Sequence, residues 1–372
     1  MSSLKRIAII IPGGLGTGRD NMGVPVLEQI VNLLSLQFDV AVFQLYKVNE
    51  DYDPKGFQLF GFKSGNKFLQ YFRFLMSFYR VHKRKKFEVV HGFWVWPCGF
   101  LAVFLGKIFK IKSITSVLGG DGATVPEINY GHLRNKFTKS MILWTLNNSN
   151  EANALTEFLA KNLYRAGLKR KLTIIAWGVN QNLFQFVTKP IQNPIQFLHI
   201  ANLSAVKDQE TLLRSFEKIQ RVVPSQLTII GEGTDEGKVK ALISELDLHK
   251  SVSLQGQLPY NQLPSMYQRC DILLHTSLSE GQSEVVTEAM SCGLLVCGTH
   301  VGAMADLSDQ CCLTVPLRDF QGLAVKVTEL LNSPSLQNNL RKNAHEWAST
   351  HSLTWTVDQY KMLYETLAAD RK

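Results

Sequence analysis

Two glutamates with seven residues between them, Glu280 and Glu288, stand in the stretch SEGQSEVVTEAMSCG. If both were helical they would lie about 12 Å apart, one helix length. That separation is too large for a general acid and base acting on one bond. The spacing favours two separate anchors for one elongated ligand, although a Glu at a helix start and a Gly after a helix end are also ordinary capping choices.

A turn-forming cluster, Gly281, Gln282 and Ser283, follows the first glutamate, and the run from Glu284 to Met290 predicts a helix. Apolar runs lie on both sides of this stretch, so the pattern predicts a strand, a tight loop, a helix and a second strand. Such a loop points the backbone N–H groups of the helix N-terminus outward, where a phosphate can bind.

The length and composition of the chain bound these possibilities. A chain of 372 residues suits two domains, and no stretch reaches the roughly 18 uncharged apolar residues of a membrane span. The apolar run near the start ends in Pro and Gly, which favours a first strand over a signal peptide. The six cysteines form no CxxC pair and mostly stand in apolar runs, which favours reduced core residues of a cytosolic protein without disulfides or a metal site.

Charge is distributed unevenly along the chain. Residues 1–185 carry 24 Lys and Arg against 11 Asp and Glu, whereas residues 186–372 carry 16 against 20. A basic half beside an acidic half indicates that one face meets an anionic membrane surface, nucleic acid or a charged substrate. Nucleic-acid binding would depend on charge alone, because the sequence contains no known nucleic-acid module.

The chain begins with a buried-strand pattern, Arg6–Ile11, that leads into a glycine loop containing Gly14 and Gly16. Glycines between a first strand and a first helix let the backbone approach a phosphate or sugar closely, or merely make room for the helix. The dinucleotide fingerprint is not met, because Arg19 stands at its third glycine. The next predicted strand ends at Tyr46 without an acidic residue for a ribose, which disfavours NAD.

His91 and Asp121 each follow the end of a predicted strand. Parallel α/β sheets place their sites at the carboxyl ends of the strands, so both residues are candidates for polar contacts with a substrate. A single His at a strand end is more often structural, and that alternative stays open.

Residues 63–87 predict an amphipathic helix that combines aromatic residues with a basic C-terminal end. One face can pack on a sheet while the cations suit the helix C-terminus. The same pattern can dock on anionic lipid.

Strands alternate with helices in both halves of the chain, which predicts two doubly wound α/β domains. The polar stretch Thr188–Pro194 contains two prolines and predicts the linker between them. We therefore expect one domain over residues 1–187 and a second over residues 195–350.

Taken together and in order, the motifs resemble the retaining GT-B glycosyltransferases of family 4. The likeness covers nearly the whole chain and is strongest over residues 197–306. The matching segments are PGGLG, VVHGFW, GGD, TEFLAKNLYRAG, WGVNQNLF, ANLSAVKDQETLL, IIGEG, GQLPYNQLPSMY, EGQSEVVTEAMSCG, GTHVGA and LTWTVDQYKMLYETL. The resemblance implies two Rossmann-like domains facing across a cleft, with residues 353–372 forming a helix that crosses back onto the N-terminal domain.

The resemblance also implies a role for each candidate residue. Glu288 would bind the ribose hydroxyls of a UDP- or GDP-linked donor sugar, Glu280 the hydroxyls of the transferred sugar, and Lys207 the leaving phosphate. The diphosphate would lie on backbone amides of the loop, and further donor-side contacts would come from a set comprising Gly14, Gly16, Asn202, Gly231, Gly281, Gln282, Ser283, Glu284 and Val285. Lys207, Glu280, His91 and Asp121 would form the catalytic set, and neither a metal nor a cofactor is implied.

Three positions depart from the family pattern: Asn202 replaces the usual arginine, Leu118 a histidine, and Ala303 a glycine. The resemblance implies a cytoplasmic enzyme, peripheral on the inner face of the membrane, that builds a lipid-linked glycan or an envelope polysaccharide. Asn202 and Leu118 keep an alternative open, a non-catalytic homologue that binds a nucleotide sugar.

Overall fold

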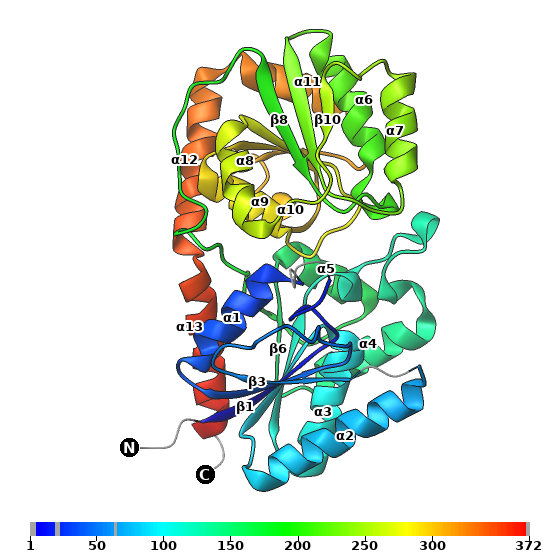
Figure 1. Ribbon diagram of the computed structural model, residues 1–372, viewed down its shortest axis with the longest axis vertical. Coiled ribbons are helices and arrows are strands. Elements are labelled where there is room, and N and C mark those ends of the chain that lie inside the picture. Colours follow the sequence, from blue (N-terminus) through cyan, green and yellow to red (C-terminus); the bar gives the residue numbers. More distant parts are fainter. Residues whose placement is uncertain (1–4, 19–22, 63–64, 370–372) are drawn as a thin grey trace. The chain divides into compact units, whose positions relative to one another are not determined.

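The computed structural model describes residues 5–18, 23–62 and 65–369, so Arg19 lies outside the described residues. The chain forms two compact units. Unit 1 contains Met1–Thr124, Gly131–Trp177 and Leu353–Lys372, and unit 2 contains Val125–Tyr130 and Gly178–Ser352. Each unit is an α/β domain with a parallel sheet of its own, as the alternating pattern predicts (Figure 1).

The described strands of unit 1 form a seven-stranded parallel sheet in the order β3-β2-β1-β4-β5-β6-β7. The first strand is buried along its whole length because its sequence, RIAIII, lies at the centre of the sheet and is covered on both faces. The strands are β1 (Arg6–Ile11), β2 (Asp39–Gln44), β3 (Gln58–Gly61), β4 (Val89–Phe93), β5 (Lys112–Val117), β6 (Glu151–Ala154) and β7 (Thr173–Ile174).

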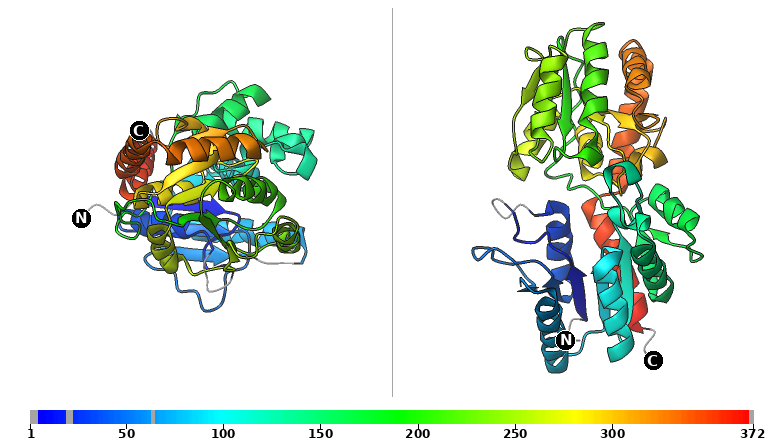
Figure 2. Two further views of the ribbon diagram at one scale, coloured as in Figure 1. Left: turned by 90° about the horizontal axis from the view of Figure 1, so that it is seen from above. Right: turned by 90° about the vertical axis from the view of Figure 1, so that its right-hand side faces the viewer.

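Helices cover both faces of this sheet (Figure 2). One face packs against α1 (Pro25–Ser35) and α13 (Leu353–Ala369), so the end of the described chain completes the core of unit 1. The other face packs against α2 (Lys67–Arg84), α3 (Phe100–Phe109), α4 (Lys136–Asn148) and α5 (Glu157–Ala166). Of the predicted helix at residues 353–372, the last three residues lie outside the described ones, as do residues 63–64 of the predicted basic helix.

Within the described residues, unit 2 contains a six-stranded parallel sheet in the order β10-β9-β8-β11-β12-β13. Its strands are β8 (Ile195–Ile200), β9 (Ser225–Ile230), β10 (Val252–Leu254), β11 (Ile272–His275), β12 (Leu295–Thr299) and β13 (Leu313–Val315). One face packs against α6 (Gln209–Gln220), α7 (Glu236–Glu245) and α11 (Phe320–Leu331). The other packs against α8 (Leu263–Arg269), α9 (Glu284–Cys292), α10 (Gly302–Asp306) and α12 (Pro334–Thr350).

The boundary between the units differs from the predicted linker. The units change between Trp177 and Gly178, and the stretch Thr188–Pro194 belongs to unit 2. The Lys189 Nζ atom lies 3.5 Å from the Asp271 Oδ1 atom, and the Val187 N–H donates to the Cys292 carbonyl at 3.3 Å. A polar composition is typical of a linker, but polar side chains can equally pair with groups of a folded domain, as Lys189 does here.

The six cysteines are free and buried, as their positions in apolar runs predict. Burial raises the pKa of the Cys297 thiol to about 12, which makes it unreactive. In the described part of the chain, no helix combines the length and apolar character needed to cross a membrane.

Candidate functional site

The loop that carries the first glutamate lies at the carboxyl end of β11 and leads into α9. Ser283 has a φ of +81°, a left-handed conformation that reverses the chain immediately before the helix. The Gln282 carbonyl accepts a hydrogen bond from the Ala303 N–H at 3.1 Å, and a Cβ atom at Gly302 would lie 2.9 Å from the Glu280 Cβ atom. The loop is therefore held against the start of α10 by a contact that needs glycine.

All five loop and helix-start candidates lie together in this segment: Gly281, Gln282, Ser283, Glu284 and Val285. The first turn of α9 has backbone N–H groups without intrahelical partners, together with the positive end of the helix dipole. Burial raises the pKa of Glu284, whose half-buried carboxyl stands in that first turn. The predicted loop and the helix that follows it are confirmed, and phosphate binding at this helix N-terminus stays a prediction.

Lys207 and Glu280, which are far apart in the sequence, form an ion pair. The Lys207 Nζ atom lies 2.6 Å from the Glu280 Oε1 atom, and the two side chains are 22% and 13% exposed. The two loops are joined by main-chain contacts, because the Leu278 N–H donates to the Val206 carbonyl at 2.8 Å. Thr276 Oγ1 also donates to the Lys207 carbonyl at 3.1 Å.

Mutual charge sets the ionisation of this pair. Burial alone would raise the pKa of Glu280, but the Lys207 charge and the contact with His275 hold that pKa well below its ordinary range. Burial alone would lower the pKa of Lys207, but Glu280 keeps it above its ordinary value. Both groups are therefore charged at neutral pH, and the pair places a fixed cation beside the N-terminus of α9.

Two further polar side chains contact Glu280, and neither was among the sequence candidates. The Ser277 Oγ donates to the Glu280 Oε1 atom at 2.6 Å, and the His275 Nε2 atom lies 3.2 Å from the same oxygen. The sequence does contain a signal for His275, since this residue ends β11, and parallel α/β sheets place their sites at strand ends. The prediction that His91 follows a strand end is wrong, because β4 continues to Phe93.

Glu288 lies in a different environment within α9. Its side chain accepts hydrogen bonds from the Tyr260 hydroxyl on Oε1 and from the Tyr267 hydroxyl on Oε2, both at 2.8 Å. The residue is 5% exposed. Burial raises the pKa of Glu288 to about 8, although the two tyrosine hydroxyls act in the opposite direction.

Asn202 and Gly231 mark the ends of the neighbouring strands β8 and β9. The Asn202 carbonyl accepts a hydrogen bond from the Gln209 amide at 3.3 Å, and the residue is exposed. Gly231 has a φ of +133°, and a Cβ atom there would lie 1.9 Å from the Ala201 carbonyl oxygen. Glycine thus permits the close approach of the two strand ends beside Asn202.

The remaining candidates belong to unit 1. Gly14 and Gly16 adopt positive φ angles in the loop after β1, and the Gln44 side chain fixes that loop through both backbone groups of Leu15. A Cβ atom at Gly16 would lie 2.3 Å from the Tyr52 ring. The glycines here permit close packing of the loop on its neighbours.

His91 is fully buried, with both ring nitrogens engaged. Its Nδ1 atom pairs with the Tyr364 hydroxyl at 2.8 Å and its Nε2 atom with the Ser116 Oγ at 2.7 Å. Burial lowers the pKa of His91 to about 3. His91 therefore links the sheet to α13, and the substrate contact that we predict for it would require breaking one of these bonds.

Asp121 is also fully buried. Its carboxylate accepts hydrogen bonds from the Val95 N–H at 2.9 Å and the Trp96 N–H at 3.3 Å, and it lies 3.3 Å from the His132 Nδ1 atom. The hydrogen bond to Asp121 raises the pKa of His132. In this arrangement the half-exposed His132, not Asp121, is the group that can meet a solute.

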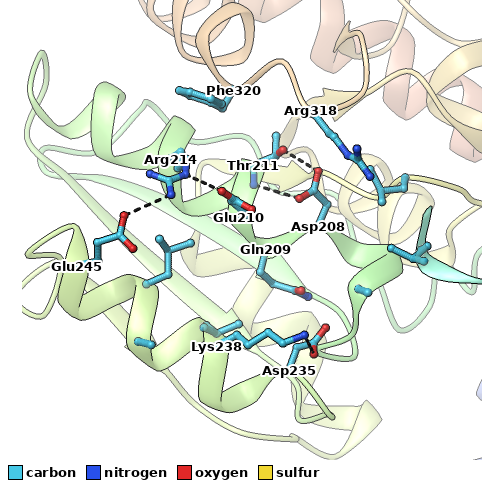
Figure 3. Close-up of a pocket in the computed structure, with 16 residues that line it drawn as sticks. Asp208, Gln209, Glu210, Thr211, Arg214, Asp235, Lys238, Glu245, Arg318 and Phe320 are labelled. Carbon is cyan, nitrogen blue, oxygen red and sulfur yellow. Dashed lines mark hydrogen bonds and ion pairs between the residues drawn. The ribbon is translucent and has the colours of Figure 1, made fainter. Parts of the chain in front are cut away.

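A separate cavity of ≈ 690 Å³ lies beside α6 and α7 in unit 2 (Figure 3). Several of its charged side chains form ion pairs: Arg214 pairs with Glu210 and Glu245, and Lys238 pairs with Asp235. The ion pair at α9 does not line it. Among the described residues, no group of three or more His, Cys, Asp or Glu side chains is placed to hold a metal ion.

Comparisons with known proteins show which family and which relatives this chain resembles. Residues 180–347 match the family described as "Glycosyl transferases group 1". The chain is 21% identical over 350 residues to an uncharacterised glycosyltransferase of Methanocaldococcus jannaschii, covering 92% of this chain and 93% of that one. It is 22% identical over 316 residues, 78% of each chain, to the N-acetyl-alpha-D-glucosaminyl L-malate synthase of Bacillus anthracis.

Solved structures give the same fold. The sucrose-phosphate synthase of Thermosynechococcus elongatus superposes with a TM-score of 0.82 at 20% identity, over 98% of this chain and all of that one. The Anabaena protein HepE, solved in complex with UDP and glucose, superposes with a TM-score of 0.77 at 17% identity, over 97% of this chain and 100% of that one. These likenesses establish the fold of this chain, two α/β domains with a parallel sheet each.

Proposed function

We propose that this chain transfers a sugar from a nucleotide-diphosphosugar, UDP- or GDP-linked, to an acceptor hydroxyl. The match to the group 1 glycosyltransferases supports this proposal. The observation that carries the proposal is the Lys207–Glu280 ion pair at the N-terminus of α9. It combines a cation, helix N–H groups and an ionised carboxylate on rigid elements of one unit. The cation and the N–H groups suit a leaving diphosphate, and the carboxylate suits the hydroxyls of a sugar.

Lys207 and the first turn of α9 stabilise the departing diphosphate. Breaking the bond between the sugar and phosphate builds negative charge on the phosphate oxygens, and preorganised donors with one cation lower the energy of that state. The backbone N–H groups after Gly281 contribute without any reorganisation, since the loop is fixed against α10.

Glu280 binds the transferred sugar and Glu288 binds the ribose. An ionised carboxylate accepts hydrogen bonds from sugar hydroxyls through the lone pairs that its protein donors leave open. Glu288 offers the same chemistry to a ribose diol once it is ionised.

We further propose that the reaction retains the configuration at the anomeric carbon and needs no metal, on the strength of the sequence resemblance. The anomeric configuration of the product, read by proton NMR, tests the first part. Full activity after chelation with EDTA supports the second, and activity restored only by a divalent cation contradicts it.

The acceptor that we propose is a glycan or glycolipid intermediate of the cell envelope. Two relatives that match parts of this chain support a lipid-linked acceptor, since their names include phosphatidylinositol and diphospho-undecaprenol. A panel of nucleotide sugars incubated with lipid extracts, with release of free nucleotide as the readout, tests transfer. Absence of both turnover and nucleotide binding would refute the proposal.

A second candidate function is nucleotide-sugar binding without transfer, which Asn202 favours because that exposed side chain adds no second cation beside Lys207. Calorimetry separates the two functions. Binding of a nucleotide sugar without release of its sugar to any acceptor supports the binding protein.

We also propose that unit 1 docks on the anionic inner face of a membrane. The Phe68 and Phe72 side chains of α2 are 79% and 50% exposed. A cavity of ≈ 460 Å³ on the same helix is lined by Phe72 and by three arginines, Arg73, Arg80 and Arg84. Exposed aromatic rings beside clustered arginines suit an interface with anionic headgroups.

Co-sedimentation with phosphatidylglycerol vesicles tests this surface. We expect F68S/F72S to lose binding, and Leu36→Ser, which alters the 75% exposed residue directly after α1, to keep it. Equal binding of the two variants would contradict docking through α2.

A further inference from the structure

His275 is buried at the carboxyl end of β11, directly behind the ion pair. The strand on one side of it contributes a glycine, and the strand on the other side contributes a second histidine. On β12 it faces Gly298, whose missing side chain lets the backbone approach, since a Cβ there would lie 1.8 Å from the His275 carbonyl oxygen. On β8 the next imidazole, His199, pairs through Nδ1 with the Leu274 carbonyl at 2.9 Å.

The contact between His275 and Glu280 fixes the hydrogen on the imidazole ring. A carboxylate only accepts hydrogen bonds, so the Nε2 atom that lies 3.2 Å from the Glu280 Oε1 atom carries the hydrogen. The Ser277 Oγ lies 3.3 Å from the same nitrogen and itself donates to Glu280. The His275 Nδ1 atom is buried and has no hydrogen-bond partner among the described residues.

Three donors therefore converge on one carboxylate oxygen. Lys207, Ser277 and His275 all contact the Oε1 atom of Glu280. Within the described part of the chain, the Oε2 atom has no such partner. This asymmetry fixes the rotation of the carboxylate and leaves one oxygen to accept hydrogen bonds from a ligand.

We propose that His275 is a positioning residue that holds Glu280 with its Oε2 atom towards the transferred sugar. This inference rests on the proposed function. The ammonium group of Lys207 would be shared between Glu280 and the leaving diphosphate. Its ion pair with Glu280 therefore weakens as negative charge develops on the phosphate. His275 and Ser277 keep the carboxylate in place at that stage, because neither is drawn to the phosphate as a cation is.

The test compares His275→Leu, which removes the N–H, with His275→Gln, whose amide places an N–H near the position of Nε2. The substrate is whichever sugar nucleotide the wild-type chain turns over in the panel, and UDP is the binding probe. We expect His275→Leu to lower kcat roughly tenfold to a hundredfold, the value of one hydrogen bond to a charged group. UDP affinity should stay within about threefold, and His275→Gln should recover most of the lost kcat.

A pH profile supplies a readout that a purely structural role would not move. The titratable groups around His275 are Glu280, Lys207 and His199. Removing the N–H raises the pKa of Glu280, so the acid limb of kcat moves to higher pH in His275→Leu and stays in place in His275→Gln. Wild-type kcat in His275→Leu, or equal loss in both variants, overturns the proposal. If His275→Leu does not fold, His275→Asn, whose shorter amide does not reach Glu280, replaces it.

One measurement needs no turnover. In protein labelled with 15N-histidine, NMR should show hydrogen on Nε2 of His275, and hydrogen on Nδ1 alone would overturn the proposal even in an inactive protein. Absence of turnover in the wild-type chain, with the Nε2 hydrogen present, would instead remove the proposed function and keep the placement of Glu280.

Discussion

Glu280 and Glu288 belong to one short stretch of unit 2, yet they lie in opposite electrostatic environments. Glu280 contacts a lysine, a histidine and a serine, and its pKa is held well below the ordinary range. Glu288 contacts two neutral tyrosine hydroxyls, and burial raises its pKa to about 8. Proximity in the sequence does not give equal chemistry, because the charge of each carboxylate depends on whether a cation lies beside it in the protein.

The difference separates two tasks. A carboxylate that is always ionised suits a sugar that must be oriented throughout the reaction. A carboxylate that exchanges a proton near neutral pH couples ligand binding to pH. Substitution of each glutamate and of its partners should therefore affect turnover and donor binding differently.

Glu280→Ala should lower kcat by roughly a hundredfold or more, because the sugar loses its anchor and Lys207 loses the charge that keeps it in place. UDP affinity should change much less. Steady-state kinetics with calorimetry checks both, and Glu280→Gln serves as the control of similar shape. A kcat close to that of the wild type in Glu280→Ala would exclude Glu280 from the reaction.

Lys207→Met should lower kcat by about a hundredfold and should also raise the pKa of Glu280, since its neighbouring cation is removed. The pH dependence of kcat should then show an acid limb at higher pH than in the wild type. If the rate falls while the acid limb does not move, Lys207 acts on the phosphate alone and the ion pair does not control Glu280.

Glu288→Ala should weaken UDP binding by roughly tenfold to thirtyfold and leave kcat at saturating donor nearly unchanged. Tyr267→Phe is the matched variant, because it removes one hydroxyl from the same carboxylate. A loss of kcat without a loss of affinity would reverse the roles that we assign to the two glutamates.

The pH dependence of stability should give the smallest effect. The pKa of Glu288 rises from its ordinary 4.5 to about 8 on folding, so the folded chain binds more protons than the unfolded chain between these values. Its contribution to stability is therefore present below about pH 4.5 and is lost as the pH rises towards 8. As the pH rises from 4.5 towards 8, the melting temperature of the wild type should fall relative to that of Glu288→Gln, which has no carboxyl group to titrate at this position. Parallel pH slopes would show that Glu288 does not titrate in this range.

The sequence predicted the strands, the glycine loops and the helix after Ser283, because buried apolar runs and turn residues determine these locally. It also indicated that Lys207 and Glu280 act together, through the family resemblance. It did not reveal the two tyrosines around Glu288, since those contacts depend on how α8 and the residues before it pack against α9. His275 was not among the candidates either, although it ends β11 shortly before Glu280. His91 shows the converse: the sequence placed it after a strand end and so indicated a site, whereas it lies within β4 and its ring nitrogens pair with Tyr364 and Ser116.

Helix α13 has a consequence for the order of events during synthesis. The hydrogen bond between His91 and Tyr364 joins residues 273 positions apart, and the α13 side chains complete the core of unit 1. While the chain emerges from the ribosome, the first unit to be made must therefore wait for the last helix, and the buried imidazole lacks one partner until then. Unit 2 is complete earlier, so the nascent chain should acquire a folded unit 2 before unit 1 becomes fully stable.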